Sequence, residues 1–455
     1  MNDTNGRHSF SGKLGFVLSA AGASVGLGNI WRFPYLAARY GGGIFLLVYI
    51  ILAVTFGYTM IMSESAIGRM TQKSSVGAFA RFGSGWMNKT GGWINAIIPL
   101  LIVPYYSVIG GWVLKYLFAY LTSGSRVMTE DTYFSGFLGS GSQQVLWFIV
   151  FILVDLAVIF LGVQNGIERV SKLVMPVLAV LAVILAIYSM TLPGAAAGIR
   201  YFLIPDFSKF SIMTVVAALG QMFYSLSIAM GILITFGSYM KKDTDMESST
   251  VQVEIFDTAV AVLSGLMIIP AVFAFSGGDP DRLNSGPSLM FITMPKIFDT
   301  IGGGQVIGIL FFVLVFFAAL TSSIALTECC VSVFEDEFGW NRKKSTVIMG
   351  LIMAGLGILS CLGFNVLSSV SILGMGILDF FDFLTNSLLM PVSALLICLL
   401  VLRKITIGKL EEEVMQSSAF RRRRLYRFVL KYLAIPLLLV IFCSSVANAF
   451  GWIHI

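Results

Sequence analysis

Apolar residues occur in long runs that recur along the whole chain, separated by short segments containing charged residues, glycine or proline. Each run approaches the ~20 residues that a helix needs to cross ~30 Å of hydrocarbon. This pattern predicts eleven membrane-spanning helices, over residues 12–38, 42–69, 92–123, 144–163, 168–191, 212–239, 252–276, 304–335, 344–363, 371–402 and 425–450.

The composition supports this interpretation. Of 455 residues, 57% are hydrophobic and only 12% are charged, and the mean hydropathy is +0.88. Soluble domains do not combine so much apolar with so little charged sequence. The chain is therefore predicted to be an all-α, multi-pass protein of the inner (plasma) membrane.

Lysine and arginine concentrate in alternate connections between the predicted spans. By the positive-inside rule, the N-terminus is expected in the cytoplasm, and an odd number of spans then leaves the C-terminus outside. This topology explains the formal net charge of +6, so the run Arg421–Arg424 is expected to contact anionic lipid rather than nucleic acid. The basic segments are those with Arg7 and Lys13, 69–89, Arg169 and Lys172, Lys241 and Lys242, 342–344 and 403–431.

Polar residues and glycines interrupt the first predicted span at residues 22–34. A polar or ionisable group in hydrocarbon costs several kcal/mol unless it lines a cavity or meets a partner. Gly22 and Gly26, four residues apart, are also typical of a small-residue face where helices pack. The neighbouring Asn29 and Arg32 favour the other interpretation, a helix broken at a binding site.

A second irregular segment, residues 221–231, lies in the sixth predicted span. Spans one to five and six to ten then form two halves. Because five is odd, the second half begins on the opposite side of the membrane, which predicts an inverted repeat with a midplane binding site. The expected division is 1–200 for the first repeat, 201–403 for the second, and 404–455 for a basic loop and eleventh helix.

Residues 22–35, followed by Gly41–Phe45, resemble the first-helix signature of the neurotransmitter:sodium symporter family, which has the LeuT fold. Eleven spans resemble its shorter bacterial branch. The resemblance implies a 5+5 inverted repeat with broken first and sixth helices plus an eleventh helix. Further matching positions are Glu64 with Gly68 and Arg69, Tyr105 and Tyr106, residues 221–231, 318–323 and 334–337.

The resemblance also implies two Na+ sites made of hard oxygen ligands, which suit a small cation. Taken alone, hydroxyls such as those of Thr321 and Ser322 are equally typical of hydrogen bonds to a carbonyl one turn earlier. The first site would use the Ser24 carbonyl, Asn29, Ser225, Asp257 and the substrate carboxylate. The second would use the carbonyls of Gly22, Val25 and Ala318 with the hydroxyls of Thr321 and Ser322.

Asp257 departs from the asparagine that well-known family members often have at about this point. A fixed negative charge here would remove the need for chloride. The alternative is a carboxylate near the end of span seven that faces water.

The resemblance points to a substrate with its own carboxylate, because amine-transporting relatives have an aspartate where this chain has Gly26. Most side chains implied around the rest of the substrate are apolar. We therefore expect a hydrophobic or aromatic amino acid, with another small zwitterion as the alternative. The implied binding residues are Ser24, Gly26, Leu27, Gly28, Ile102, Tyr106, Tyr224, Ser227, Met230, Ser322 and Leu326.

Outer and inner gates follow from the same resemblance. On the outside, Arg32 is expected to pair with Asp382, with Asp379 as a competing partner one turn earlier. On the inside, Arg7 is expected to pair with Asp336, near Tyr239. Solvated surface charges are the alternative for the inner pair.

Together these features predict a sodium-coupled symporter that works by alternating access. A channel could also use broken helices, but the sequence has no ring-forming selectivity motif. An enzyme is not expected, because the chain has only two histidines, His8 and His454, both near its ends.

Overall fold

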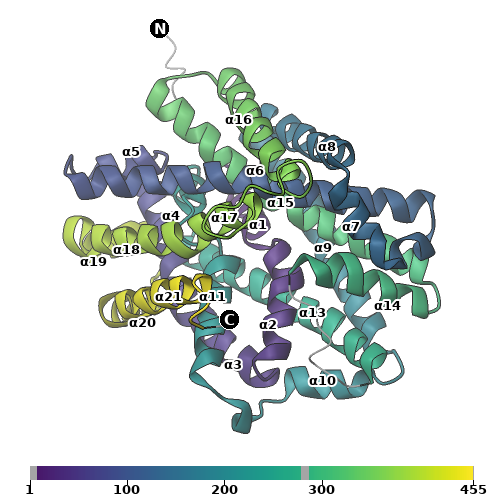
Figure 1. Cartoon of the computed structure of the whole chain (residues 1–455). Helices are drawn as coiled ribbons and strands as arrows, with labels where there is room; N and C mark the ends of the chain where they lie inside the picture. Colours follow the sequence, from purple (N-terminus) through teal and green to yellow (C-terminus); the bar gives the residue numbers. More distant parts are fainter. Residues whose placement is uncertain (1–7, 278–285, 454–455) are drawn as a thin grey trace.

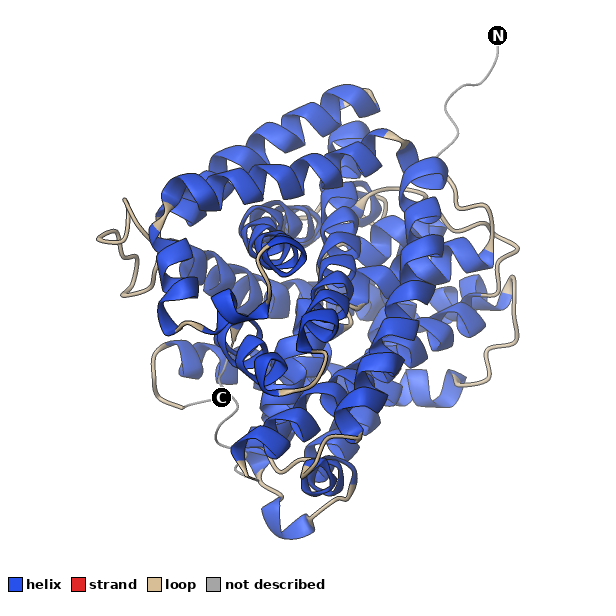
Figure 2. Cartoon of the chain, turned by 90° about the vertical axis from the view of Figure 1, so that its right-hand side faces the viewer, coloured by secondary structure: helices blue, strands red, loops and turns tan. Residues whose placement is uncertain are grey.

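The computed structural model describes residues 8–277 and 286–453. Helices and loops make up these ranges, as Figure 2 shows. The only β-type pairings within them are two isolated bridges, Gly42 with Pro205 and Ile372 with Met375. The Arg7 part of the predicted inner gate lies outside the described residues.

Eleven spans are present in the described ranges. Nine helices are long and apolar enough to cross a membrane, and a bent pair forms the first span. The sixth is split into two shorter helices, α11 (Ile212–Ser225) and α12 (Ile232–Ser238). The nine are α3–α4 (Gly43–Thr71), α6 (Trp86–Thr122), α8 (Gly141–Phe160), α9 with a preceding π-helical segment (Val163–Met190), α13 (Met246–Ser276), α15 (Gly304–Phe338), α16 (Arg342–Leu362), α17–α18 (Ile377–Ile405) and α20–α21 (Arg423–Ala449).

Shorter helices lie in the connections. They are α5 (Ser75–Ala80), α7 (Asp131–Gly139), α10 (Ala195–Leu203), α14 (Met294–Thr300) and α19 (Ile407–Met415), with 3₁₀ turns at Ser125–Thr129 and Phe207–Lys209.

Three predicted boundaries differ by six residues from the observed helix starts. Helix α6 begins at Trp86 rather than 92. Helix α13 begins at Met246 rather than 252, because the Asp245 carboxylate accepts the Ser248 N–H at its N-terminus. The tenth span begins at Ile377 rather than 371, because Leu373 and Gly374 have positive φ angles and hold the chain in a turn.

The first span is broken as predicted. Helix α1 (Lys13–Ser24) ends where Val25 takes an extended conformation, with ψ of 93°. A π-helical turn (Gly28–Arg32) then leads into α2 (Phe33–Arg39), and the two halves meet at 56°. Both halves lie near the centre of the bundle in Figure 1, where α1 packs against α9, α13 and α15. The break is therefore enclosed by protein rather than by lipid.

The sixth span is broken between Ser225 and Ile232. Three residues there have left-handed backbone conformations: Ser227 (φ 52°), Ala229 (φ 62°) and Gly231 (φ 73°). A Cβ atom makes the left-handed backbone conformation unfavourable, so non-glycine residues adopt it only where surrounding contacts hold them. A Cβ atom at Gly231 would also lie 2.8 Å from the Asn95 carbonyl oxygen. The chain thus has glycine where it approaches another backbone most closely.

The second half of the sixth span packs backbone to backbone against α4. A Cβ atom on Gly68 would overlap the carbonyl oxygen of Ile234, and one on Gly237 would overlap that of Ser65. Two glycines, one on each helix, therefore let α4 and α12 approach closely.

Several arginines of the basic segment 421–427 form ion pairs with buried glutamates while their own side chains stay partly exposed. Arg422 pairs with Glu254 at 3.2 Å, and Arg423 and Arg427 both pair with the buried Glu411. Burial would raise the pKa of Glu411, but hydrogen bonds from the two guanidinium groups outweigh it and lower that pKa. Contact of the Arg421–Arg424 run with anionic lipid stays a prediction.

Gly68→Ala is expected to lower the melting temperature of the detergent-solubilised protein by several degrees. The added methyl group must push α12 away from α4, and overpacking of this kind costs about 1–3 kcal/mol. Gly355→Ala is the matched control, because nothing lies within 4 Å of a Cβ atom there. Equal melting temperatures for the two variants would contradict close packing at Gly68.

Candidate substrate and sodium sites

A pocket lies where the two broken spans meet α6 and α15. The family resemblance implies eleven substrate-binding residues, and all eleven line this pocket. Ala23 and Ile232 also line it, and the sequence did not single them out. The two missed residues are apolar members of α1 and α12, and their sequence positions carry no signal that separates them from core residues.

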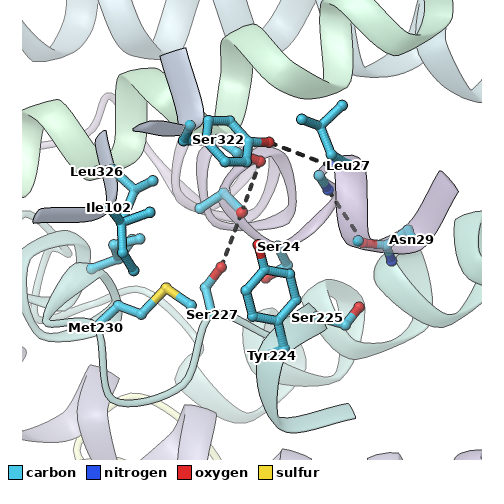
Figure 3. Close-up of a pocket in the computed structure, with 15 residues that line it drawn as sticks. Ser24, Leu27, Asn29, Ile102, Tyr224, Ser225, Ser227, Met230, Ser322 and Leu326 are labelled. Atoms are coloured by element: carbon cyan, nitrogen blue, oxygen red, sulfur yellow. Dashed lines mark hydrogen bonds between the residues drawn. The ribbon is translucent and has the colours of Figure 1, made fainter. Parts of the chain in front are cut away.

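The pocket has an apolar end and a polar end. Figure 3 shows Ile102, Met230 and Leu326 grouped on one side, whereas Leu27 and Asn29 of the first span lie on the other. A ligand with an apolar body and a polar head would therefore bind in one orientation, with its apolar body at the apolar end and its polar head at the polar end.

Backbone groups of the first break are exposed to the polar end. The Gly26 N–H donates to Asn29 Oδ1 at 3.2 Å, and the Leu27 N–H lies 3.4 Å from the Tyr106 hydroxyl. The second contact is too long to be strong. A carboxylate placed here would meet N–H groups at the start of a helical segment, which is a favourable site for an anion.

A cluster of oxygen atoms adjoins this polar end. Asp257 is fully buried and accepts hydrogen bonds from Asn29 Nδ2 at 2.8 Å, from the Ser225 hydroxyl at 3.0 Å and from the Tyr49 hydroxyl at 3.2 Å. The alternative in which Asp257 faces water is therefore wrong. Tyr49 is a further member of the cluster that the sequence analysis missed.

This cluster fits a sodium ion. Every donor to the Asp257 carboxylate within the described residues is neutral. A buried carboxylate without a cationic partner is costly, so a small cation beside it would be stabilised. The oxygen atoms of Asn29, Ser225 and Asp257 are of the kind that hard cations prefer.

A second oxygen cluster lies between α1 and α15. The Ser322 hydroxyl is 3.2 Å from the Gly22 carbonyl oxygen, 3.1 Å from that of Ala23 and 3.3 Å from that of Val25. One hydroxyl proton cannot satisfy three carbonyl groups, so carbonyl lone pairs around this hydroxyl remain without a donor. This arrangement also fits a sodium ion.

Thr321 behaves differently from Ser322. Its hydroxyl donates to the Phe317 carbonyl at 2.9 Å and lies 3.3 Å from that of Ala318, as expected for a hydroxyl that bonds back along its own helix. Its side chain nevertheless faces α1, since a Cβ atom on Gly22 would lie 3.1 Å from Thr321 Cβ. The structure thus brings the predicted second set together.

Glu64 of α4 holds the sixth-span break in place. Its Oε1 atom accepts the Ala229 N–H at 2.8 Å, and the side chain is fully buried. No role for Glu64 was predicted from the sequence. Its position in an apolar helix was the available signal, because an ionisable residue inside the membrane usually has a specific partner.

A second cavity adjoins the pocket and shares Tyr106 and Tyr224 with it. Arg32, Asp379 and Asp382 all line this cavity. Arg32 places its guanidinium carbon 5.4 Å from the centre of the Tyr224 ring, and no direct ion pair joins it to either aspartate within the described residues. Asp382 is held in place by the Tyr105 hydroxyl at 3.2 Å and by Asn386 Nδ2 at 2.6 Å.

Ion pairs and hydrogen bonds that the sequence did not predict surround Asp336 and Tyr239, the described members of the predicted inner gate. Asp336 accepts the Ser74 N–H at 2.6 Å and lies 3.7 Å from Lys73 Nζ. Tyr239 donates its hydroxyl to Glu328 at 2.7 Å, and Glu328 binds Arg342 through both carboxylate oxygens at 3.1 and 2.5 Å. Glu328 and Arg342 are fourteen residues apart on adjacent helices, so only the tertiary structure shows their pairing.

Comparisons with known proteins agree with this architecture. The sequence model of the sodium:neurotransmitter symporter family matches residues 7–133 and 135–451. The sodium-dependent transporter YhdH of Bacillus subtilis is 34% identical over 95% of this chain and 96% of its own. A sodium-dependent transporter of Haemophilus influenzae is 32% identical over 96% of this chain and 98% of its own.

The crystal structure of MhsT in complex with L-phenylalanine is similar to the whole fold, with a TM-score of 0.86. It is 38% identical and covers 97% of this chain and 100% of the MhsT chain. The chain therefore belongs to the sodium:neurotransmitter symporter family. It is a sodium-dependent, multi-pass membrane transporter with the LeuT fold, and not an enzyme.

Glu64→Ala is expected to speed amide hydrogen exchange in residues 226–231 by about tenfold or more, because a buried N–H without its acceptor costs about 1–3 kcal/mol. Glu64→Gln keeps an acceptor oxygen and should leave most of the protection. Glu130→Ala removes an exposed glutamate and serves as the control. Unchanged exchange in Glu64→Ala would show that Glu64 does not hold the break.

Proposed function

We propose that this transporter couples the sodium gradient to the import of a hydrophobic or aromatic amino acid. The observation that carries the proposal is the two-ended pocket, whose polar end adjoins the Asp257 cluster and whose apolar end is formed by Ile102, Met230 and Leu326. A zwitterion with an apolar side chain matches both ends. MhsT, which has the same fold, was crystallised with L-phenylalanine.

In this proposal the substrate carboxylate meets the amides of Leu27 and Gly28 and the Tyr106 hydroxyl, and completes the first sodium site. The amine faces the carbonyl groups of the sixth-span break. Ion and substrate stabilise each other because they share one ligand. The flexible Met230 side chain can adapt to side chains of different size.

Two sodium ions are proposed. Asn29, Ser225, Asp257 and the Ser24 carbonyl would hold the first. Ser322, Thr321 and the carbonyl groups of Gly22, Val25 and Ala318 would hold the second. The second site would tie α1 to the eighth span (α15), so that loss of this ion frees α1 to move.

Chloride independence is proposed from the same cluster. Asp257 supplies a fixed negative charge beside the first sodium site, where all its described donors are neutral. An additional anion there would be repelled by the carboxylate.

Alternating access would use the polar residues on the outer side of the pocket and those on its inner side. On the outer side, Arg32 would pair with Asp382 when the cavity closes over Tyr106 and Tyr224. Asp382 is the better partner than Asp379 because Tyr105 and Asn386 already orient its carboxylate. On the inner side, Tyr239 and Asp336 would release their partners as the inner end opens.

We further propose that the N-terminus is cytoplasmic, that the C-terminus is external, and that the protein resides in the plasma membrane. The Arg421 and Arg424 guanidinium groups are the part of the basic run free to contact anionic lipid, because neither has an ion-pair partner within the described residues. The division into repeats at 1–200 and 201–403, with 404–455 outside them, remains part of this proposal.

Proteoliposomes containing the purified protein are expected to accumulate labelled L-phenylalanine saturably, and only with an inward sodium gradient. Phenethylamine, which lacks the carboxylate, should compete poorly and with weak sodium dependence. A panel of other zwitterions tests the alternative substrate class. Flux that is linear in substrate and independent of sodium would indicate a channel and overturn the proposal.

Asp257→Asn is expected to weaken sodium activation of uptake by about tenfold or more, because a charged ligand is replaced by a neutral one. Wild-type uptake should be unchanged when gluconate replaces chloride, whereas the variant should gain activity from chloride. Asp243→Asn, which removes an exposed carboxylate, is the control. Strict chloride dependence of the wild type would reject the role proposed for Asp257.

A further inference from the structure

A second buried carboxylate, which the proposed transport cycle does not use, lies between α8 and α15. Asp155 of α8 is fully buried. Its Oδ2 atom is 2.8 Å from the Thr327 hydroxyl of α15, and its Oδ1 atom has no hydrogen-bond partner within the described residues. An ionisable side chain in a membrane-spanning helix calls for a functional explanation.

No cationic side chain faces Asp155 within the described residues. Its neighbours on α15 are Ser323, Thr327 and Cys330, and the Thr327 hydroxyl in turn lies 3.9 Å from the Met353 sulfur of α16. Five charged groups on the elements packed against α8 have partners of their own, and Lys89, Glu337 and Lys343 on these helices are exposed. Lys115 lies over the Trp147 ring, Glu168 binds Ser11 and Lys172, Glu328 and Arg342 bind each other, and Lys344 lies over Trp340.

These surroundings suit a neutral carboxylic acid and no metal ion. An ionised carboxylate removed from water costs several kcal/mol unless a cation or several donors compensate it. Thr327 donates one hydrogen bond to Asp155, and the nearby Ser323 hydroxyl is the other polar neighbour of this carboxyl group within the described residues. A metal cation needs more oxygen ligands than this, whereas a proton needs only the carboxylate itself.

The site is directly connected to the inner side of the transporter. Ile159, one turn after Asp155 on α8, accepts a hydrogen bond from Arg342 Nε at 2.9 Å. Thr327 precedes Glu328, which binds both Arg342 and Tyr239. The contact between α8 and α15 at Asp155 therefore continues into the ion-pair cluster that holds Tyr239.

We propose that Asp155 is a proton-binding site whose bound proton keeps α8 packed against α15 and thereby supports the inner cluster. The protonated acid is neutral and fits the dry contact. When the proton leaves, the buried charge favours conformations in which water enters between the two helices. Because the neutral form is the one that packs, this contribution is present at low pH and is lost as pH rises.

Infrared difference spectroscopy tests the site without relying on transport. The spectrum of the wild type minus that of Asp155→Asn is expected to contain the carbonyl band of a protonated carboxylic acid, and this band should disappear at alkaline pH. Asp243→Asn should give no such band. Identical wild-type and Asp155→Asn spectra in this region would show that Asp155 is ionised and would overturn the proposal.

Uptake measured against pH, at a fixed sodium gradient, tests whether the proton on Asp155 affects transport. Wild-type uptake is expected to fall with rising pH, approaching about tenfold per pH unit once the site titrates. Asp155→Asn mimics the neutral acid and should remove this fall, whereas Asp243→Asn should keep it. Thr327→Val should shift the pH at which uptake falls. The same alkaline loss in Asp155→Asn would overturn the link to transport.

This pH test rests on the proposed amino acid uptake, but the infrared test does not. If labelled phenylalanine is not transported and the carboxylic acid band is still present, the substrate proposal fails while the proton site stands.

Discussion

The structure depends on satisfying unwound backbone in the middle of a membrane protein. Hydrocarbon offers no hydrogen bonds, so each unpaired N–H or carbonyl group costs several kcal/mol. At the sixth-span break, Glu64 accepts the Ala229 N–H, and the Ser227 hydroxyl donates to the Ala23 carbonyl. At the first break, Asn29 accepts the Gly26 N–H. The two breaks are thus stable because protein groups replace the missing helical bonds.

Some polar groups at the breaks are left without enough partners, and these groups form the proposed sodium sites. Three carbonyl groups converge on the single Ser322 hydroxyl, and Asp257 has only neutral donors. Both features are unfavourable without a cation and favourable with one. The same physical constraint that requires Glu64 and Asn29 therefore explains why ion binding can be linked to the conformation of the first and sixth spans.

Charged side chains join the helices around the breaks to one another. Glu328 of α15 joins Tyr239 at the end of α12 to Arg342 at the start of α16. Asp155 lies one turn before the α8 carbonyl that receives Arg342. A change in charge at any of these groups alters how α8, α15 and α16 pack, because in a low-dielectric interior such pairs interact strongly.

The sequence by itself determined the membrane class, the eleven spans and the location of both breaks, because hydropathy and the cost of Asn29 and Arg32 in hydrocarbon are properties of local segments. Its resemblance to a known family also named eleven substrate-binding residues, all of which line one pocket. Only the tertiary structure decided the rest. The partners of Asp257, Glu328 and Asp155 lie on other helices, and helix starts such as Ile377 depend on turns rather than on hydropathy. Pairings between distant segments are set by how helices pack, and that geometry has no signature at a single sequence position.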